Sequence, residues 1–303
     1  MREISIFKME SVFEMGEVDN LISLREKIKK DEVILNQIEQ DYKQNQNEFK
    51  HEYLTARINY LHNNYFYCWL FLKTHFEQAY ASERFFPDYQ KEEMKKHGWM
   101  LPQFFINKSI STSGDTGITT EELYIRNIDR LFDELFCFSI GDPGSRIDRY
   151  YKQAIFNYHS RNYYSCAVSL FPIIESYHQH MTRFNEDSFY RIKGNLGKVD
   201  QKIENVKQIF ATKIEYYINL VKQFDDLAEN YYFVTSLSRE DEPEIINRNR
   251  IMHGLFSREI SQKDCLQLFC TLSNMVTIAS LIDANEAMDR IAEEIKTLEE
   301  SNR

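Results

Sequence analysis

Two arginines, an asparagine and a histidine fall within six residues in the stretch RNRIMHG, at positions 248–254. On a helix, residues four apart lie on one face, so Asn249 and His253 are neighbours, and Arg250 lies on the adjoining flank. Arg248 lies about 140° round the helix from His253, but its long side chain can reach the same cleft. An imidazole beside a guanidinium suits cleavage of an RNA phosphodiester without a metal. The imidazole transfers a proton, and the guanidinium stabilises charge on the phosphate oxygens.

The spacing of arginine and histidine is weak evidence when it stands alone. In a chain with 8 histidines, chance gives on the order of one match to such a pattern. A second match runs from Arg57 to His62, and we expect these two residues to be structural or merely solvated because nothing around them repeats the context. The C-terminal match has Asn249 directly after an arginine and Gly254 directly after the histidine, on a short helix before a long apolar one.

In this context RNRIMHG resembles the Arg-Asn-x-x-x-His signature of the HEPN superfamily. The domains of this superfamily are all-helical, and many are metal-independent ribonucleases of toxin, abortive-infection and other antiviral systems. The preceding segment RYYKQAIFNYHSRNYYSCAVSLFPIIESYHQ is similar to the segment that precedes the signature in other members. The resemblance covers roughly residues 145–284, about half of the chain.

The resemblance implies a role for each residue of the signature. Arg248 would contact the scissile phosphate, His253 would be the acid–base residue, and Asn249 would orient one or the other. Arg250 would add positive charge at the substrate, and Glu175 matches an acidic position near the site. The resemblance also implies an RNA substrate, a homodimer with a composite site, and a cytoplasmic endoribonuclease of prokaryotic defence or a toxin system. An antitoxin or another regulatory partner would be compatible with such a system.

The composition favours an all-α protein. The 303 residues include only 9 Gly and 5 Pro, and strands with their turns usually need more of both. The net charge of −10 argues against a broadly basic surface that binds long nucleic acid without specificity. A small, locally basic RNA site remains compatible with this charge.

The remaining motifs predict a cytoplasmic protein without a cofactor. The five cysteines are an odd number without a CxxC pair, which favours reduced thiols and argues against structural zinc. The sequence has no glycine-rich phosphate loop, so we expect neither a cofactor nor a bound metal. The N-terminus lacks the apolar core of a secretory signal. The most apolar run, Tyr65 to Leu72, is too short to span a bilayer, so we expect no membrane partner.

Periodicity and breaks divide the chain into an N-terminal helical module of unknown role (1–140) and a HEPN-like helical domain (141–303). Residues 17–76 carry a heptad pattern in which one core position is apolar and the companion position alternates between apolar and polar residues. This pattern predicts one long helix. A linker is expected at 139–145. Further helices are expected at 146–158, 163–184, 199–233, 243–253, 262–284 and 286–300.

Capping signals set the ends of the helix that carries the signature. Asp241 or Glu242 can cap it, Pro243 fits its first turn, and Gly254 supplies a C-terminal stop. The stretch 261–264, Ser-Gln-Lys-Asp, looks like a capping box that opens the next helix.

Two other functions remain open. One is a noncatalytic helical module for RNA binding, nucleotide binding or dimerisation, in which Arg248 and His253 bind the ligand or form the interface. The other is a structural adaptor with no nucleic-acid role.

Overall fold

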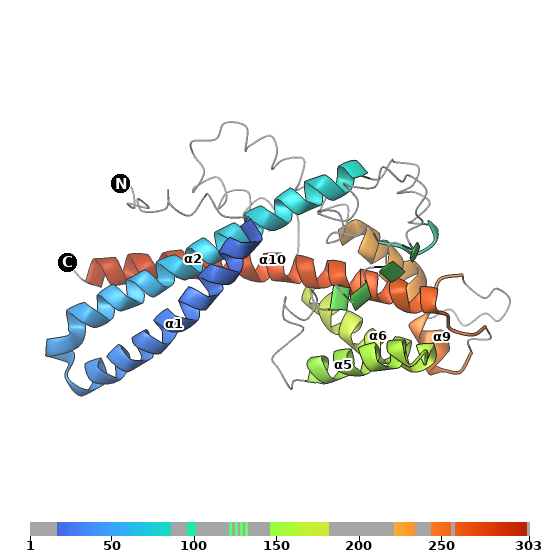
Figure 1. Ribbon diagram of the computed structural model, residues 1–303, viewed down its shortest axis with the longest axis horizontal. Coiled ribbons are helices and arrows are strands. Elements are labelled where there is room, and N and C mark those ends of the chain that lie inside the picture. The colour runs from blue at the N-terminus through green and yellow to red at the C-terminus, as the bar shows by residue number, and fades with distance from the viewer. Residues whose placement is uncertain are drawn as a thin grey trace. The chain divides into compact units, whose positions relative to one another are not determined.

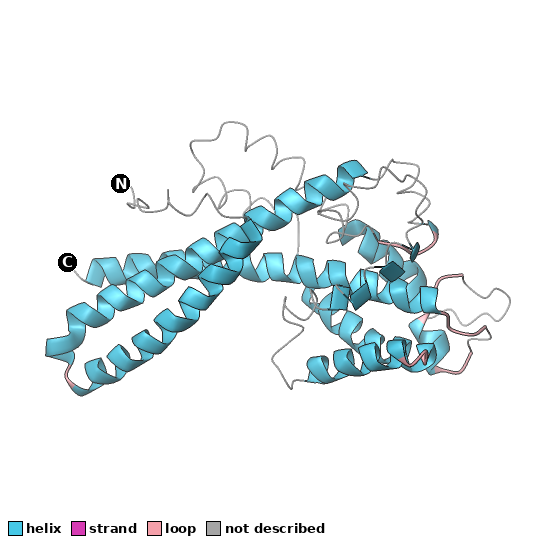
Figure 2. Ribbon diagram, viewed as in Figure 1, coloured by secondary structure: helices cyan, strands magenta, loops and turns pink. Residues whose placement is uncertain are grey.

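The chain forms an all-α fold. The computed structural model describes residues 17–85, 96–100, 121–122, 125–126, 128–129, 131–132, 146–181, 221–233, 244–255 and 258–301. This part is 88% helical and contains no strand (Figure 2). The predicted fold class is therefore confirmed. The predicted linker at 139–145 and most of the predicted helix 199–233 lie outside the described residues.

Figure 1 shows the helices in chain order. They are α1 (Glu17–Gln44), α2 (Gln46–Phe85), α5 (Arg146–His159), α6 (Tyr163–Met181), the π-helical turn η3 (Ala228–Tyr232), α9 (Arg248–Met252) and α10 (Gln262–Ser301). The chain divides into two compact units. One contains α1, most of α2 and the second half of α10, and the other contains α5, α6, η3, α9 and the first half of α10. These limits differ from the predicted 1–140 and 141–303, whose independent folding remains a prediction.

The prediction of one long helix over residues 17–76 is wrong, because the helix breaks at Asn45. The backbone N–H of Asn45 still donates to Asp41, while its carbonyl accepts from Phe49 (3.2 Å) as the first bond of α2. The Asn45 side chain donates to the Glu48 carboxylate (2.6 Å) in the first turn of α2. Asparagine favours such helix boundaries because its side chain bonds locally and competes with the helical ladder.

The break at Asn45 produces a helical hairpin (Figure 1). The rings of Tyr42 and Tyr53 stack across it, with centroids 4.7 Å apart. In the same unit, Arg57 of α2 forms an ion pair with Glu294 of α10 (2.6 Å). This contact agrees with the structural role expected for Arg57.

The prediction of two helices at 262–284 and 286–300 is also wrong, since α10 is continuous from Gln262 to Ser301. The predicted break coincides with Asn285, a residue type that favours caps over helix interiors. Here Asn285 is only 5% exposed, and apolar residues on both sides of it, Ile282 and Met288, are also buried. Burial of the flanking side chains overrides the weak local preference.

The core of the second unit is built around α10. The completely buried side chains of its first half include Leu266, Phe269, Cys270, Leu272, Met275 and Ile278. By length and composition alone, α10 could cross a membrane, but 94% of its most apolar window is buried inside the protein. Such burial is typical of a core helix.

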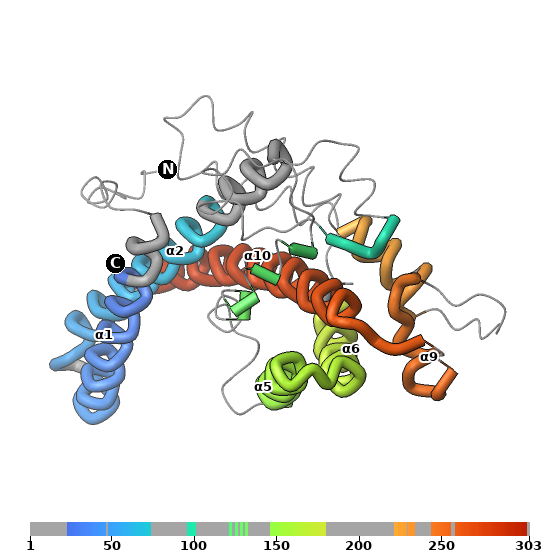
Figure 3. Tube along the Cα trace, turned by 45° about the vertical axis from the view of Figure 1, so that its right-hand side comes forward, coloured from blue at the N-terminus to red at the C-terminus, as the bar shows by residue number. Residues whose placement is uncertain are grey.

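The helices α5 and α6 occur where they were predicted and pack side by side as a hairpin (Figure 3). Asn162 lies between them and caps α6, since its side-chain oxygen accepts a hydrogen bond from the backbone N–H of Ser165 in the first turn of α6 (3.3 Å). On the inner face of α5, the ring of Tyr158 lies edge-on to Phe269 of α10 and to Phe132. These ring contacts fix the hairpin against α10.

Candidate functional site

The signature helix α9 is shorter than predicted. It begins at Arg248 rather than near residue 243, and residues 244–247 before it are not helical. Asn247 is the N-cap: its backbone is extended, and its side-chain oxygen accepts from the backbone N–H of Arg250 (2.8 Å). The predicted start is therefore wrong, and the caps proposed at 241–243 lie outside the described residues.

The C-terminal end of α9 follows the prediction. Gly254 has φ +66°, the left-handed conformation that glycine adopts without strain. Its N–H donates to the carbonyl of Ile251 (3.1 Å), and the N–H of Leu255 donates to Arg250 (2.8 Å). These two bonds form a Schellman motif, which ends the helix at His253.

Two asparagine side chains attach α9 to the end of the π-helical turn η3. The side-chain amide of Asn247 donates to the carbonyl of Tyr231, and that of Asn249 donates to the carbonyl of Phe233 (2.9 Å). The two amides donate to carbonyls at the C-terminal end of η3, where a helix has no N–H groups of its own to offer them. The sequence carries no signal for the π-turn, so this anchor could not be predicted.

Arg248, Asn249 and Glu175 come together in the structure. The Arg248 guanidinium donates to the Asn249 side-chain oxygen (3.0 Å) and lies 3.4 Å from the carboxylate of Glu175 on α6. The side chains of Arg248 and Glu175 are 33% and 41% exposed. Asn249 therefore bonds to η3 with its amide nitrogen and to Arg248 with its oxygen, so it orients the guanidinium.

The other two residues assigned to the site lie apart from this cluster. His253 is the C-cap of α9, and its side chain is exposed. Its imidazole makes no hydrogen bond to the residues that the structure describes. Arg250 is only 8% exposed, so its side chain lies inside the fold and not on the solvent-facing side of α9. This burial favours a structural role for Arg250 over direct contact with a substrate.

A second histidine lies beside the cluster and was not among the predicted site residues. His178 follows Glu175 by three residues on α6, so the two side chains share one side of the helix. The His178 ring stacks on Phe233 (centroids 5.8 Å apart) and lies edge-on to Phe224 (5.3 Å). Phe233 also supplies the carbonyl that binds Asn249. The spacing from Glu175 was the one signal in the sequence that could have identified His178.

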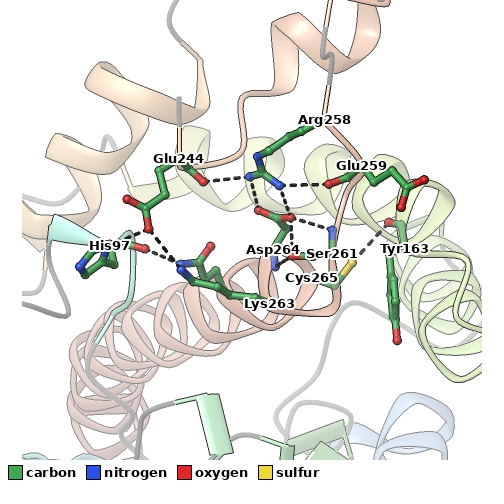
Figure 4. Close-up of polar contacts among 10 residues, drawn as sticks. His97, Tyr163, Glu244, Arg258, Glu259, Ser261, Lys263, Asp264 and Cys265 are labelled. Atoms are coloured by element: carbon green, nitrogen blue, oxygen red, sulfur yellow. Dashed lines mark hydrogen bonds and ion pairs between the residues drawn. The ribbon is translucent and has the colours of Figure 1, made fainter. Parts of the chain in front are cut away.

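An ion pair between the half-buried Arg258 and the buried Asp264 connects the segments that flank α9 (Figure 4). The Arg258 guanidinium donates two hydrogen bonds to Asp264 (2.6 and 2.7 Å) and one to the carbonyl of Glu244 (2.8 Å). Glu244 precedes α9 and Asp264 opens α10, so Arg258 joins the two flanks of the signature helix. Burial alone would raise the pKa of the Asp264 carboxyl, but the bonds from Arg258 and Ser261 leave it below its usual range.

The capping box predicted at 261–264 is confirmed within this cluster. The backbone N–H of Ser261 donates to the Asp264 carboxylate (2.8 Å), and the N–H of Asp264 donates to the Ser261 hydroxyl (3.3 Å). Asp264 therefore has two functions, because it caps α10 and also binds Arg258.

A segment that the sequence assigned to the N-terminal module packs beside the same cluster. The imidazole of His97 lies 2.9 Å from the Glu244 carboxylate (Figure 4). The carbonyl of His97 accepts from Gln267 of α10, and the carbonyl of Met100 accepts from the Cys270 thiol (3.0 Å). Residues 97–100 thus belong to the unit that carries α9.

Comparison with known proteins finds no matching family model, no similar curated protein and no similar solved structure. The structure defines an all-α protein with a half-exposed Arg–Asn–Glu cluster and an exposed histidine at the other end of the short helix α9. Membership of the HEPN superfamily remains a prediction.

Proposed function

We propose that this chain is a metal-independent endoribonuclease of the HEPN type, acting in prokaryotic antiviral defence or in a toxin system. Its catalytic residues are Arg248 and His253, and Asn249 positions the guanidinium. The proposal includes a homodimer with a composite site, a cytoplasmic location and regulation by an antitoxin or another partner.

One observation carries the proposal. A guanidinium and an imidazole are presented to solvent by the same one-turn helix, at its first residue and at its C-cap. Arg248 is oriented by Asn249, which is itself anchored to the carbonyl of Phe233. A preorganised guanidinium stabilises developing charge better than a mobile one, because the site does not need to reorganise during the reaction.

The chemistry assigned to these residues follows from their types. The 2′-hydroxyl of the RNA attacks the adjacent phosphorus, and the bond from phosphorus to the 5′-oxygen breaks. The products are a 2′,3′-cyclic phosphate and a 5′-hydroxyl end. His253 moves a proton in this step, either from the attacking hydroxyl or to the leaving oxygen. Arg248 exchanges the Glu175 carboxylate for the phosphate, which has a similar arrangement of acceptor oxygens.

The test is cleavage of single-stranded RNA by the full chain in the presence of EDTA. His253→Ala is expected to slow cleavage by about 10²–10⁴-fold, and Arg248→Ala by about 10²–10³-fold. The matched controls are His51→Ala and Arg290→Ala, which replace exposed residues of α2 and α10 and should leave the rate unchanged. Intact RNA with the wild-type chain, or equal cleavage by His253→Ala, would contradict the proposal.

A noncatalytic module for binding RNA or a nucleotide, or for dimerisation, is the second candidate. The observation that favours it is the pairing of Arg248 with Glu175, which already neutralises the guanidinium. This candidate predicts that RNA stays intact while binding depends on Arg248. Glu175→Gln separates the two, because releasing Arg248 should strengthen binding in either case but raise a cleavage rate only in an enzyme.

A further inference from the structure

The solvent-facing side of α5 combines cations with an exposed aromatic ring. Arg149, Lys152, Gln153 and Phe156 follow the spacing i, i+3, i+4, i+7, which places them on one face of the helix. Arg146 lies one turn before Arg149. All five side chains are exposed, and the ring of Phe156 is 66% exposed. The opposite face of α5 packs on the core, so this face is turned toward solvent.

Two further rings are exposed in the same hairpin. Tyr150 of α5 is 40% exposed, and Tyr164 in the first turn of α6 is 55% exposed. Single exposed aromatic residues are common in proteins. This hairpin exposes three of them, together with several cations, which are the side-chain types that single-stranded nucleic acid needs.

Acidic residues are sparse in α5 and in the first half of α6. Between residues 146 and 174 the sequence contains one carboxylate, Asp148, although the net charge of the chain is −10. Asp148 is 4% exposed and accepts a hydrogen bond from Lys152 (2.9 Å), so it offsets that lysine and not the arginines. A further carboxylate, that of Asp129, lies at the C-terminal end of α5, where it is 3.7 Å from the imidazole of His159 and so faces that histidine.

Arg161 adds a third arginine in a conformation that the side chain does not favour. It has φ 58°, the left-handed region, at the end of α5. Its N–H donates to Tyr158 (3.0 Å) and the N–H of Asn162 donates to Asn157 (2.9 Å), which defines a Schellman motif with Arg161 at the position where glycine is preferred. Arg161 is therefore an exposed arginine at a position that glycine would occupy with less strain.

We infer that this hairpin surface binds single-stranded RNA. We call it the α5 platform, and it consists of Arg146, Arg149, Tyr150, Phe156, Arg161 and Tyr164. Unpaired bases stack on the exposed rings, while the guanidinium groups contact the phosphates. Arg146, Arg149 and Arg161 have no carboxylate partner among the described residues, so their charge is available to a polyanion.

The inference rests on the proposed function for the choice of RNA over DNA, and it deepens that function by specifying unpaired RNA. A duplex offers its phosphates to the arginines but keeps its bases stacked inside, so the rings would add nothing. The platform and the candidate site share one hairpin, because α6 packs on α5 and also carries Glu175, which contacts Arg248. RNA bound along α5 is thereby supported by the same rigid pair of helices as the Arg248 cluster.

The test measures binding of a fluorescein-labelled single-stranded oligouridylate by fluorescence anisotropy. The full-length chain carries His253→Ala so that the RNA is not consumed. Adding Phe156→Ala is expected to weaken binding about tenfold or more, and Phe156→Trp should restore it. Arg149→Ala should also weaken binding, and it should lower the slope of log affinity against log salt concentration by about 0.7.

The matched controls are Val33→Ala and Arg290→Ala, which remove an exposed apolar side chain and an exposed arginine from α1 and α10. Both should bind RNA as the parent does. Unchanged affinity in Phe156→Ala and Arg149→Ala, or equal losses in the controls, would overturn the inference. So would equal binding of an RNA duplex with the same dependence on Phe156. If Phe156→Ala changes the molecular mass in light scattering and leaves RNA affinity unchanged, the surface is a protein interface and the inference also fails.

The two proposals fail in different experiments. Absence of cleavage by the wild-type chain, together with binding that depends on Phe156, removes the nuclease and keeps the platform. Cleavage that depends on His253, together with binding that ignores Phe156 and Arg149, removes the platform and keeps the nuclease.

Discussion

The helices α9 and α10 follow one another in the chain but are fixed by different kinds of interaction. The five residues of α9 are fixed by directional polar contacts: the N-cap and amide bonds of Asn247, the amide of Asn249, the Schellman motif at Gly254 and the Arg258 ion pair next to it. The forty residues of α10 are fixed mainly by burial of apolar side chains. The position of α9 therefore depends on directional hydrogen bonds, and that of α10 depends on the burial of apolar surface.

This difference has a consequence for function. Burial contributes large, nondirectional free energies, whereas a single hydrogen bond contributes about 0.5–1.5 kcal/mol but fixes a direction. Changes in α10 should therefore lower the stability of the whole unit. Changes to the single hydrogen bonds around α9 should reorient Arg248 and His253 at a smaller cost in stability, whereas the Arg258 ion pair next to α9 should cost more. The ratio of lost stability to lost RNA cleavage distinguishes the two regions.

The largest effect on stability is expected from Phe269→Ala. The Phe269 side chain is completely buried in α10 and contacts the rings of Phe132 and Tyr158. Removing a buried phenylalanine side chain typically costs about 3–5 kcal/mol. Chemical denaturation followed by circular dichroism measures this loss. Phe156→Ala, which removes an exposed ring, is the control, and similar losses in both variants would contradict the comparison.

Arg258→Ala is expected to cost nearly as much although it removes a polar group. It leaves the Asp264 carboxylate, 2% exposed, without its cation, and breaking a buried pair in this way costs about 3 kcal/mol. The double variant Arg258→Ala with Asp264→Asn should recover part of the loss, since the buried charge is gone. Denaturation midpoints of the wild type, the Arg258→Ala and Asp264→Asn single variants and the double variant test this, and additive losses in the double variant would show that the pair does not interact.

The same pair predicts how stability depends on pH. The folded pKa of Asp264 is lowered, net of burial, by hydrogen bonds from Arg258 and Ser261. A carboxyl group whose pKa is lower in the folded chain than in the unfolded chain stabilises the fold. This stabilisation is fully present above the unfolded pKa of about 3.9, and it is lost as the pH falls through the folded pKa. The wild-type chain should therefore lose stability below about pH 4 more steeply than the double variant. Parallel pH profiles would exclude this contribution.

Asn247→Ala is expected to have a smaller effect on stability and a larger one on the site. Loss of an N-cap typically costs about 1 kcal/mol. This substitution also removes the bond to Tyr231, so α9 should shift relative to η3 and RNA cleavage should fall. Asn247→Asp keeps the cap acceptor and loses the donor, which separates the two effects. Cleavage at the wild-type rate in Asn247→Asp would show that the bond to Tyr231 does not position α9.

Local signals in the sequence predicted those parts of the fold that local interactions determine. The helices α5 and α6 were predicted from periodicity, and the capping box at Ser261 and the stop at Gly254 from short-range backbone requirements. The all-α class followed from composition. Among the site residues, the proximity of Glu175 to Arg248 agrees with the resemblance that suggested it.

Long-range contacts determine the features that were missed. The start of α9 depends on Asn247, whose amide binds Tyr231 sixteen residues earlier, and the local signal at Pro243 pointed elsewhere. Arg250 was placed beside the substrate because it lies three residues before His253 on the helix, whereas the fold buries it. The continuity of α10 through Asn285 depends on burial that no local pattern reports.

The smallest expected effects come from two residues that occupy the same position in two Schellman motifs. Gly254, at the end of α9, has φ +66°, and Arg161, at the end of α5, has φ 58°. A methyl group added at Gly254 meets nothing within 4 Å, so Gly254→Ala should cost about 1 kcal/mol from backbone strain alone. Arg161→Gly should instead gain up to about 1 kcal/mol, less the extra entropy of glycine in the unfolded chain. Thermal unfolding of both variants and of the wild type measures these two changes in stability. If Arg161→Gly both raises the melting temperature and weakens RNA binding, then the Arg161 guanidinium contributes to RNA binding at a cost in stability at the end of α5. A stabilised variant with undiminished RNA binding would leave that strain without a function.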